Sequence, residues 1–164
     1  MVPFFAMTTL HTIGYEGVDL VDFLRQLIAA KVDVVVDVRE LPLSRKKGFS
    51  KGALSAALAA HGIEYVHMSA LGCPKTTRDR LKLDGDWRAY ERSFRAHLKS
   101  QGAAVRAVAD LARRKTTCLL CFEADYSKCH RSLVARAAVA AGAPQLVHLT
   151  PETRVFDDPL RAAA

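Results

Sequence analysis

A thiol, an imidazole and a guanidinium stand side by side at Cys129-His130-Arg131, and the carboxylate of Glu123 precedes them in the same polar stretch. A thiol can act as a nucleophile, an imidazole or a carboxylate can transfer protons, and a guanidinium can hold an oxyanion or a phosphate. We therefore take Cys129, Glu123 and His130 as candidate catalytic residues and Arg131 as a candidate anion-binding residue.

A strand and a helix are expected on either side of this stretch. Residues 116–122 form an apolar and β-branched run, which predicts a buried strand. An Ala-rich run that ends at Gly142 predicts the helix, with Ser127 as its N-cap. The Cys-His-Arg run would then fall in the first helical turn. Unpaired backbone N–H groups and the helix dipole favour an anion there, and they promote ionisation of a nearby thiol.

The same residues have purely structural interpretations, which stay open at this point. Cys129 would be a small, half-buried side chain, and Arg131 would pair with Glu123 or Asp37. Glu123 would then serve in a salt bridge rather than as a general base. The sequence does not decide whether the chain is an enzyme.

Cys121 closes the predicted strand and is either a core residue or a redox partner of Cys129, although seven residues separate the two. A metal site would draw on Cys121, Cys129 and His130, with His67 as a further ligand. Structural zinc sites prefer cysteines two to four residues apart, and Cys121 and Cys129 are not so spaced. We therefore predict no metal and no cofactor.

The densest basic run lies between Arg39 and Lys51, in a long loop after a predicted strand. Arg39, Ser44 and Arg45 are candidate anion-binding residues, which would complete a phosphate-binding rim together with Arg131. The alternative is a solvated basic loop.

Tyr15 and His67 also lie at predicted strand ends and are candidate substrate-binding residues. Tyr15 would stack on a base or a sugar, whereas a buried Tyr is the structural alternative. His67 is either part of the site or a hydrogen-bonded histidine of the core.

Apolar runs predict strands at residues 10–13, 32–38, 63–68, 116–122 and 145–149, with helical patterns between them. This alternation predicts an α/β fold with three layers, a mostly parallel sheet of about five strands flanked by helices. The carboxyl ends of parallel strands share one edge, where ligands bind in such sheets. All the candidate residues follow predicted strands and should converge there.

The chain of 164 residues suits a single α/β domain, which we place at residues 7–150. We expect an N-terminal extension at residues 1–6, with Met7 as an alternative start, and a C-terminal tail at residues 151–164. Residues 75–86 are polar and read as an irregular surface excursion or a lid.

The net charge is +7, which favours an anionic small molecule or nucleic acid as partner; the alternative is a merely solvated surface. Four cysteines do not make a disulfide framework at this length, and we find neither a secretory signal nor a run of about 20 apolar residues. We expect a cytoplasmic protein with reduced thiols and no membrane partner. The oligomeric state is left open.

Short motifs in a fixed order carry a resemblance to a known family. They are Thr12-Ile13-Gly14-Tyr15; Asp37-Val38-Arg39 with Pro42 and Ser44; Gly48-Phe49-Ser50; Tyr65-Val66-His67 with Leu71-Gly72; and Cys121-Phe122-Glu123 with Cys129-His130-Arg131. Together, over residues 10–149, they resemble the domain of unknown function 488 family. The resemblance implies a compact single-domain α/β protein and no assigned reaction. Other members often carry glycine after the Leu-Gly pair, where this chain has Cys73, which argues against an essential role for Cys73.

Our leading hypothesis is an enzyme that acts on a phosphate-containing or other anionic substrate at a Cys/Arg site on the carboxyl edge of the sheet. The rival hypothesis is a non-catalytic nucleic-acid-binding module. It would use the same basic rim together with residues 75–99, where Lys and Arg outnumber Asp and Glu by eight to four.

Overall fold

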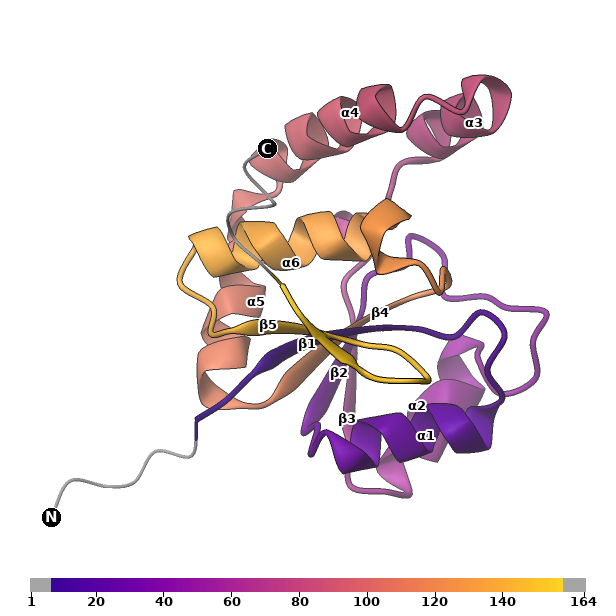
Figure 1. Cartoon of the computed structure of the whole chain (residues 1–164), viewed down its shortest axis with the longest axis vertical. Coiled ribbons are helices and arrows are strands. Elements are labelled where there is room, and N and C mark those ends of the chain that lie inside the picture. The colour runs from indigo at the N-terminus through magenta and orange to yellow at the C-terminus, as the bar shows by residue number, and fades with distance from the viewer. Residues whose placement is uncertain (1–6, 158–164) are drawn as a thin grey trace, which may run out of the picture.

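A computed structural model describes residues 7–157, and the predictions for residues 1–6 and 158–164 lie outside this range (Figure 1). One sheet of six strands has the order β3-β2-β4-β1-β5-β6. The first five strands are parallel, and only β6 runs antiparallel, against β5. Their bounds are β1 Leu10–Gly14, β2 Val34–Asp37, β3 Glu64–His67, β4 Thr117–Cys121, β5 Leu146–Leu149 and β6 Arg154–Phe156. The predicted α/β class, with a mostly parallel sheet, is confirmed.

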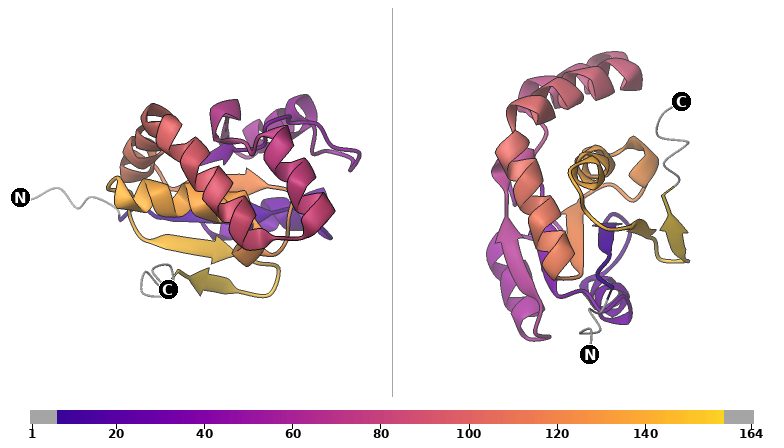
Figure 2. Two further views of the ribbon diagram at one scale, coloured as in Figure 1. Left: turned by 90° about the horizontal axis from the view of Figure 1, so that it is seen from above. Right: turned by 90° about the vertical axis from the view of Figure 1, so that its left-hand side faces the viewer.

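Helices cover both faces of this sheet and make it the middle of three layers (Figures 1 and 2). One apolar cluster joins α1 (Leu20–Ala29) and α2 (Lys51–Ala59) to the sheet. A second cluster, on the other face, includes side chains of α4 (Trp87–Ser100), α5 (Gly102–Arg114) and α6 (His130–Ala140). Side chains alternate along β4, so that Cys118 and Leu120 belong to the first cluster and Leu119 to the second.

Helices α1 and α4 each bury one apolar face. In α1, Asp19 caps the helix by accepting a hydrogen bond from the backbone N–H of Asp22. In α4, the buried residues are Tyr90, Phe94 and Leu98, which recur every four positions. Helix α4 packs on α5 and α6 rather than on the sheet.

Two segments differ from the sequence-based expectation. Residues Lys75–Asp84, expected to be irregular, form the helix α3 between Pro74 and Gly85, whose φ of 66° ends the helix. None of its residues is buried, so it shows no apolar stripe from which a helix could be predicted. The tail expected from residue 151 contains β6, which adds an edge strand to the sheet.

The parallel register brings the carboxyl ends of the central strands together. Gly14 lies beside Cys121, and Asp37 lies between His67 and Leu120. Two 3-10 turns follow at this edge, η1 (Ser69–Leu71) after β3 and η2 (Tyr126–Lys128) before α6. Across residues 7–157, no helix is long and apolar enough to span a membrane.

Candidate functional site

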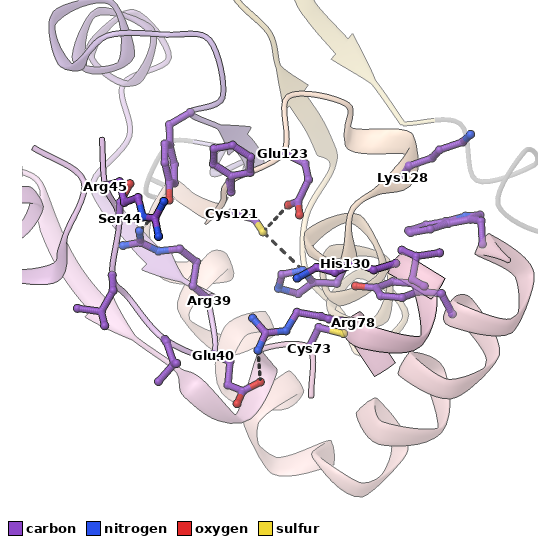
Figure 3. Close-up of a pocket in the computed structure, with 18 residues that line it drawn as sticks. Arg39, Glu40, Ser44, Arg45, Cys73, Arg78, Cys121, Glu123, Lys128 and His130 are labelled. Carbon is purple, nitrogen blue, oxygen red and sulfur yellow. Dashed lines mark hydrogen bonds and ion pairs between the residues drawn. The ribbon is translucent and has the colours of Figure 1, made fainter. Parts of the chain in front are cut away.

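A cavity of about 520 Å³ opens at the carboxyl edge of the sheet (Figure 3). Its floor includes Cys121, Glu123 and His130, and its walls come from the loop after β2 and from α3 and α4. Five lysine and arginine side chains line it: Arg39, Arg45, Arg78, Lys82 and Lys128. Apolar side chains line it as well: Leu41, Leu43, Leu81, Trp87 and Phe122.

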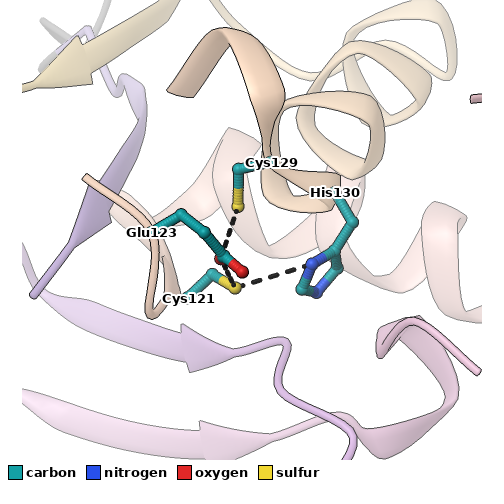
Figure 4. A group of neighbouring side chains, drawn as sticks. All are labelled: Cys121, Glu123, Cys129 and His130. Atoms are coloured by element: carbon teal, nitrogen blue, oxygen red, sulfur yellow. Dashed lines mark hydrogen bonds between the residues drawn. The ribbon is translucent and has the colours of Figure 1, made fainter. Parts of the chain in front are cut away.

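A cluster of four side chains lies at the floor of the cavity; we call it the cysteine cluster, and it consists of Cys121, Glu123, Cys129 and His130 (Figure 4). One atom from each, two sulfurs, a carboxylate oxygen and an imidazole nitrogen, all lie within 4.8 Å of one another. Glu123 Oε2 is 2.9 Å from Cys121 Sγ and 3.3 Å from Cys129 Sγ. Cys121 Sγ is 3.5 Å from His130 Nδ1.

The imidazole of His130 is held by a single backbone contact and by an aromatic ring. Its Nε2 lies 2.8 Å from the carbonyl oxygen of Val38, so this nitrogen carries a proton and donates it. In the neutral ring, Nδ1 must then be an acceptor, and Nδ1 faces Cys121. Phe94 packs edge-on against the ring. The ring is therefore fixed with its basic nitrogen toward the thiols.

Three acidic groups crowd this small volume. Burial alone would raise the pKa of Cys129. Its hydrogen bonds with Cys121 and His130, together with the positive charges of His130 and Arg131, outweigh burial and hold this pKa well below its usual value. Burial and the Cys129 thiolate raise the pKa of Cys121, and the same two causes raise the pKa of Glu123. The cluster thus favours one thiolate, because two thiolates and a carboxylate would repel one another.

The start of α6 differs from the prediction. The helix begins at His130, and Cys129 occupies the N-cap position with an extended backbone and no capping hydrogen bond from its side chain. Ser127 is not the N-cap, because it lies in η2, where Asp125 accepts hydrogen bonds from its backbone N–H and its hydroxyl. Cys129 therefore borders the first turn rather than lying within it.

Arg131 is fully buried and does not line the cavity. Its guanidinium donates to the carbonyl oxygens of Glu123 (2.5 Å) and Ala124 (3.4 Å), so it holds the loop that carries Glu123. Gly14 completes this contact, because a Cβ there would lie 1.9 Å from the carbonyl oxygen of Glu123. Only glycine allows the end of β1 to approach the loop so closely.

Arg39 lines the cavity, yet its guanidinium is occupied. It donates to both carboxylate oxygens of Asp37 (2.9 and 2.7 Å), to the Tyr15 hydroxyl (3.0 Å) and to the carbonyl oxygen of Phe49 (2.8 Å). Tyr65 donates to the same carboxylate at 2.6 Å. We call Asp37, Arg39, Tyr15 and Tyr65 the arginine network. Burial lowers the pKa of Arg39, but the contact with Asp37 outweighs it and raises that pKa above its usual value.

The remaining predicted site residues are divided between the cavity and its surroundings. Ser44 and Arg45 line the cavity, as does Tyr15, whose ring stacks on Phe49 with centroids 4.4 Å apart. His67 lies outside the lining, and its Nε2 lies 2.8 Å from the carbonyl oxygen of Arg39. The fold thus brings Cys121, Glu123, Cys129 and His130 together and turns Arg131 and His67 away from the cavity.

Sequence reasoning left Cys121 open and did not single out Arg78 and Lys82. Cys121 reaches the cavity because it is the last residue of β4, and Arg78 and Lys82 reach it from α3. The excess of Lys and Arg over residues 75–99 was the only signal for the latter two. Cys118 stands three residues before Cys121 on the same strand, so it points to the opposite face and cannot join the cysteine cluster.

Comparison with known proteins gives one match. The profile of the family described as Domain of unknown function DUF488 matches residues 19–138. This range contains all four members of the cysteine cluster. No curated protein and no solved structure matches the chain.

Proposed function

Because this chain belongs to the DUF488 family, whose description names no activity, we propose a function from the site itself. We propose that the chain is an enzyme that acts on a phosphate-containing or other anionic substrate in the cavity at the carboxyl edge of the sheet. One observation carries the proposal: thiol, carboxylate and imidazole groups meet within 4.8 Å at the floor of a cavity that four cations line besides Arg39.

The four cations Arg45, Arg78, Lys82 and Lys128 are the groups that would hold the anion. They replace Arg39 and Arg131 in this role, because both of those guanidiniums are occupied inside the protein. Arg78 forms one ion pair with Glu40 at 3.3 Å, and both side chains are partly exposed, so the pair is weak and a substrate anion can compete for the guanidinium.

The apolar part of the lining constrains the substrate further. Leu41, Leu43 and Phe122 are exposed large apolar side chains that line the cavity, and Trp87 lies in the same lining. A solvent-exposed apolar patch beside cations fits a ligand with an apolar or planar portion next to its anionic group. A bare inorganic anion would leave that patch uncovered.

The cysteine cluster would supply the reactive groups. Cys121 and Cys129 are the thiols, and His130 offers Nδ1 as a proton acceptor because Val38 fixes Nε2 as a donor. Glu123 contacts both sulfurs and can accept or return a proton. Cys121 lines the cavity and Cys129 lies behind it, so a substrate would meet Cys121, Glu123 and His130 first.

A screen of phosphorylated and carboxylated compounds with the full-length protein tests this proposal. We expect turnover of at least one class, a KM that rises several-fold in Arg78→Ala and Lys128→Ala, and loss of turnover in Glu123→Gln. Arg25→Ala is the matched control, because Arg25 is an exposed cation that pairs with Asp22 on α1, away from the cavity. Turnover that is unaffected by Glu123→Gln would contradict the proposal.

The nucleic-acid-binding hypothesis stays a prediction, and the same variants separate it from the enzyme. A binding module should bind nucleic acid with an affinity that falls steeply with salt, and binding should survive Cys129→Ser. An enzyme that acts on small anions should lose turnover when the cysteine cluster is altered.

A further inference from the structure

We propose that Cys121, Glu123, Cys129 and His130 bind one divalent transition-metal ion of the zinc type. The inference deepens the proposed function, because it names the cofactor of the same site. Metal binding can nevertheless be measured without any substrate, so the two proposals can fail separately.

The spacing of the four donor atoms fits a tetrahedral ion. With Zn–S bonds of about 2.3 Å and Zn–N or Zn–O bonds of about 2.0 Å, neighbouring sulfur and nitrogen or sulfur and oxygen ligands lie about 3.5 Å apart. Cys121 Sγ is 3.5 Å from His130 Nδ1, and Cys129 Sγ is 3.3 Å from Glu123 Oε2. Of these three separations, the 2.9 Å between Cys121 Sγ and Glu123 Oε2 would have to widen, and donor atoms as far apart as 4.8 Å would have to close in on the ion.

The surroundings of His130 are those of a metal ligand. A ligating histidine usually donates its second ring N–H to a carbonyl or a carboxylate, which fixes the tautomer and the orientation of the ring. His130 Nε2 makes this contact with the carbonyl oxygen of Val38 at 2.8 Å, and Nδ1 faces the other donors. The ring is therefore prepared to bind an ion through Nδ1.

The charges around the cluster also call for a cation. Metal binding requires both thiols to lose their protons, and two thiolates and a carboxylate would then place three negative charges within 4.8 Å of one another. A divalent ion removes two of these charges, and the buried guanidinium of Arg131 can balance the third. Among residues 7–157, no carboxylate forms an ion pair with Arg131, and its Nε has no hydrogen-bond partner. A buried arginine without an acidic partner is explained if it offsets an anionic metal centre.

The donor set selects the class of ion. Thiolate and imidazole ligands suit zinc and related transition metals, whereas magnesium and calcium require oxygen ligands. Glu123 supplies the only oxygen and lines the cavity, so it is the ligand that water or a substrate could replace. The rule of closely spaced cysteines missed this site, because its ligands come from a strand end, a loop and the start of a helix.

Metal binding is tested on the full-length protein after removal of metal with a chelator. We expect equilibrium dialysis against Zn²⁺ to give one tightly bound equivalent. Cys121→Ser and Cys129→Ser should each weaken binding by roughly a hundredfold or more, because loss of a residue that only hydrogen-bonds to a metal ligand already costs about 10–100-fold. Cys73→Ser is the matched control: Cys73 is a buried thiol of the same cavity, outside the cluster, and its replacement should leave zinc binding unchanged.

Cobalt gives a readout that does not depend on the stability of a variant. Co²⁺ bound to the wild-type protein should show the thiolate-to-cobalt charge-transfer band and the visible bands of a tetrahedral site. Less than one bound equivalent of Zn²⁺, a cobalt spectrum without a thiolate band, or zinc binding that persists in the Cys121→Ser/Cys129→Ser double variant would overturn the inference. Zinc binding without turnover of any anionic compound would instead overturn the proposed function alone.

Discussion

Two groups of buried polar residues lie at the same edge of the sheet and differ in whether their charged groups are paired with opposite charges. In the arginine network, Arg39 is surrounded by acceptors, and Asp37 accepts from Arg39 and from Tyr65. In the cysteine cluster, two thiols and a carboxyl group contact one another, and no lysine or arginine forms an ion pair with Glu123 in the described part of the chain. The first group is internally satisfied, and in the second no lysine or arginine is paired with the carboxylate.

This difference assigns the two groups their roles. Buried charges that are fully paired hold the fold and are costly to separate. Buried acidic groups that are left without a cation mark a site where a ligand or a reaction supplies what is missing. We therefore propose that the arginine network shapes the cavity and that the cysteine cluster acts in it.

The largest expected effect is a loss of stability when the arginine network is disrupted. Arg39→Ala leaves the carboxylate of Asp37 buried without its cation, so we expect the free energy of unfolding to fall by about 3–5 kcal/mol. Urea unfolding at neutral pH measures this loss. Arg25→Ala, which removes an exposed ion pair, should change stability by less than about 1 kcal/mol. Equal losses in the two variants would contradict the structural role of the network.

A third buried group, His11 in β1, extends the comparison to a histidine with no acidic partner. Burial, together with the charge of Arg154, lowers the pKa of His11 to about 4. The unfolded chain then binds a proton below about pH 6.5 that the folded protein does not bind, so stability should fall from pH 6.5 to pH 4, by up to about 3 kcal/mol. In urea unfolding over this range, His11→Gln should show a shallower fall. An unchanged pH dependence would show that His11 does not titrate in this way.

Gly14→Ala tests the contact that supports the cysteine cluster from β1. The added Cβ would meet the backbone of Glu123, so we expect a loss of about 1–3 kcal/mol in stability and weaker zinc binding. Gly52→Ala is the control, because nothing lies within 4 Å of a Cβ at that position in α2. That substitution should stabilise the protein by about 0.4–1 kcal/mol. Zinc affinity that is the same in Gly14→Ala as in the wild type would show that the contact does not position Glu123.

The smallest change in stability is expected within the cysteine cluster itself. In metal-free protein, Glu123→Gln removes a carboxylate that has no cation in contact, so unfolding in urea should shift by less than about 1 kcal/mol. The same variant should lose turnover and bind zinc more weakly. A large loss of stability with intact turnover would reverse the roles that we assign to the two groups.

Local patterns predicted much of the fold. Apolar runs located five strands to within one or two residues, and helices lie between them as expected. Helix α3 was missed because none of its residues is fully buried, and β6 because three mostly exposed residues carry no distinct period. Helix α3 is delimited by Pro74 and Gly85, and β6 is held by backbone pairing with β5, so the apolar pattern of their own side chains does not reveal either element.

The sequence predicted which residues lie at the candidate site better than it predicted what each of them contacts. Glu123, Cys129 and His130 do meet at the carboxyl edge, since parallel strands bring them there. The partners of Arg39 and Arg131 depend on which buried acceptors lie within reach in three dimensions, and sequence spacing does not contain that information. Cys121 was ambiguous for the same reason, because a strand end faces either the core or a cavity.

Alkylation of the four cysteines tests most directly whether the cysteine cluster is the reactive centre of the cavity. Metal-free full-length protein is treated with iodoacetamide at neutral pH, and peptide mass spectrometry locates the first label. Within the cluster, the pKa of Cys129 lies well below its usual value, whereas burial raises the pKa of Cys73, which lines the same cavity, to about 11. We predict the first label within the cluster and its suppression by one equivalent of Zn²⁺. First labelling of Cys73 or Cys118 would contradict the account.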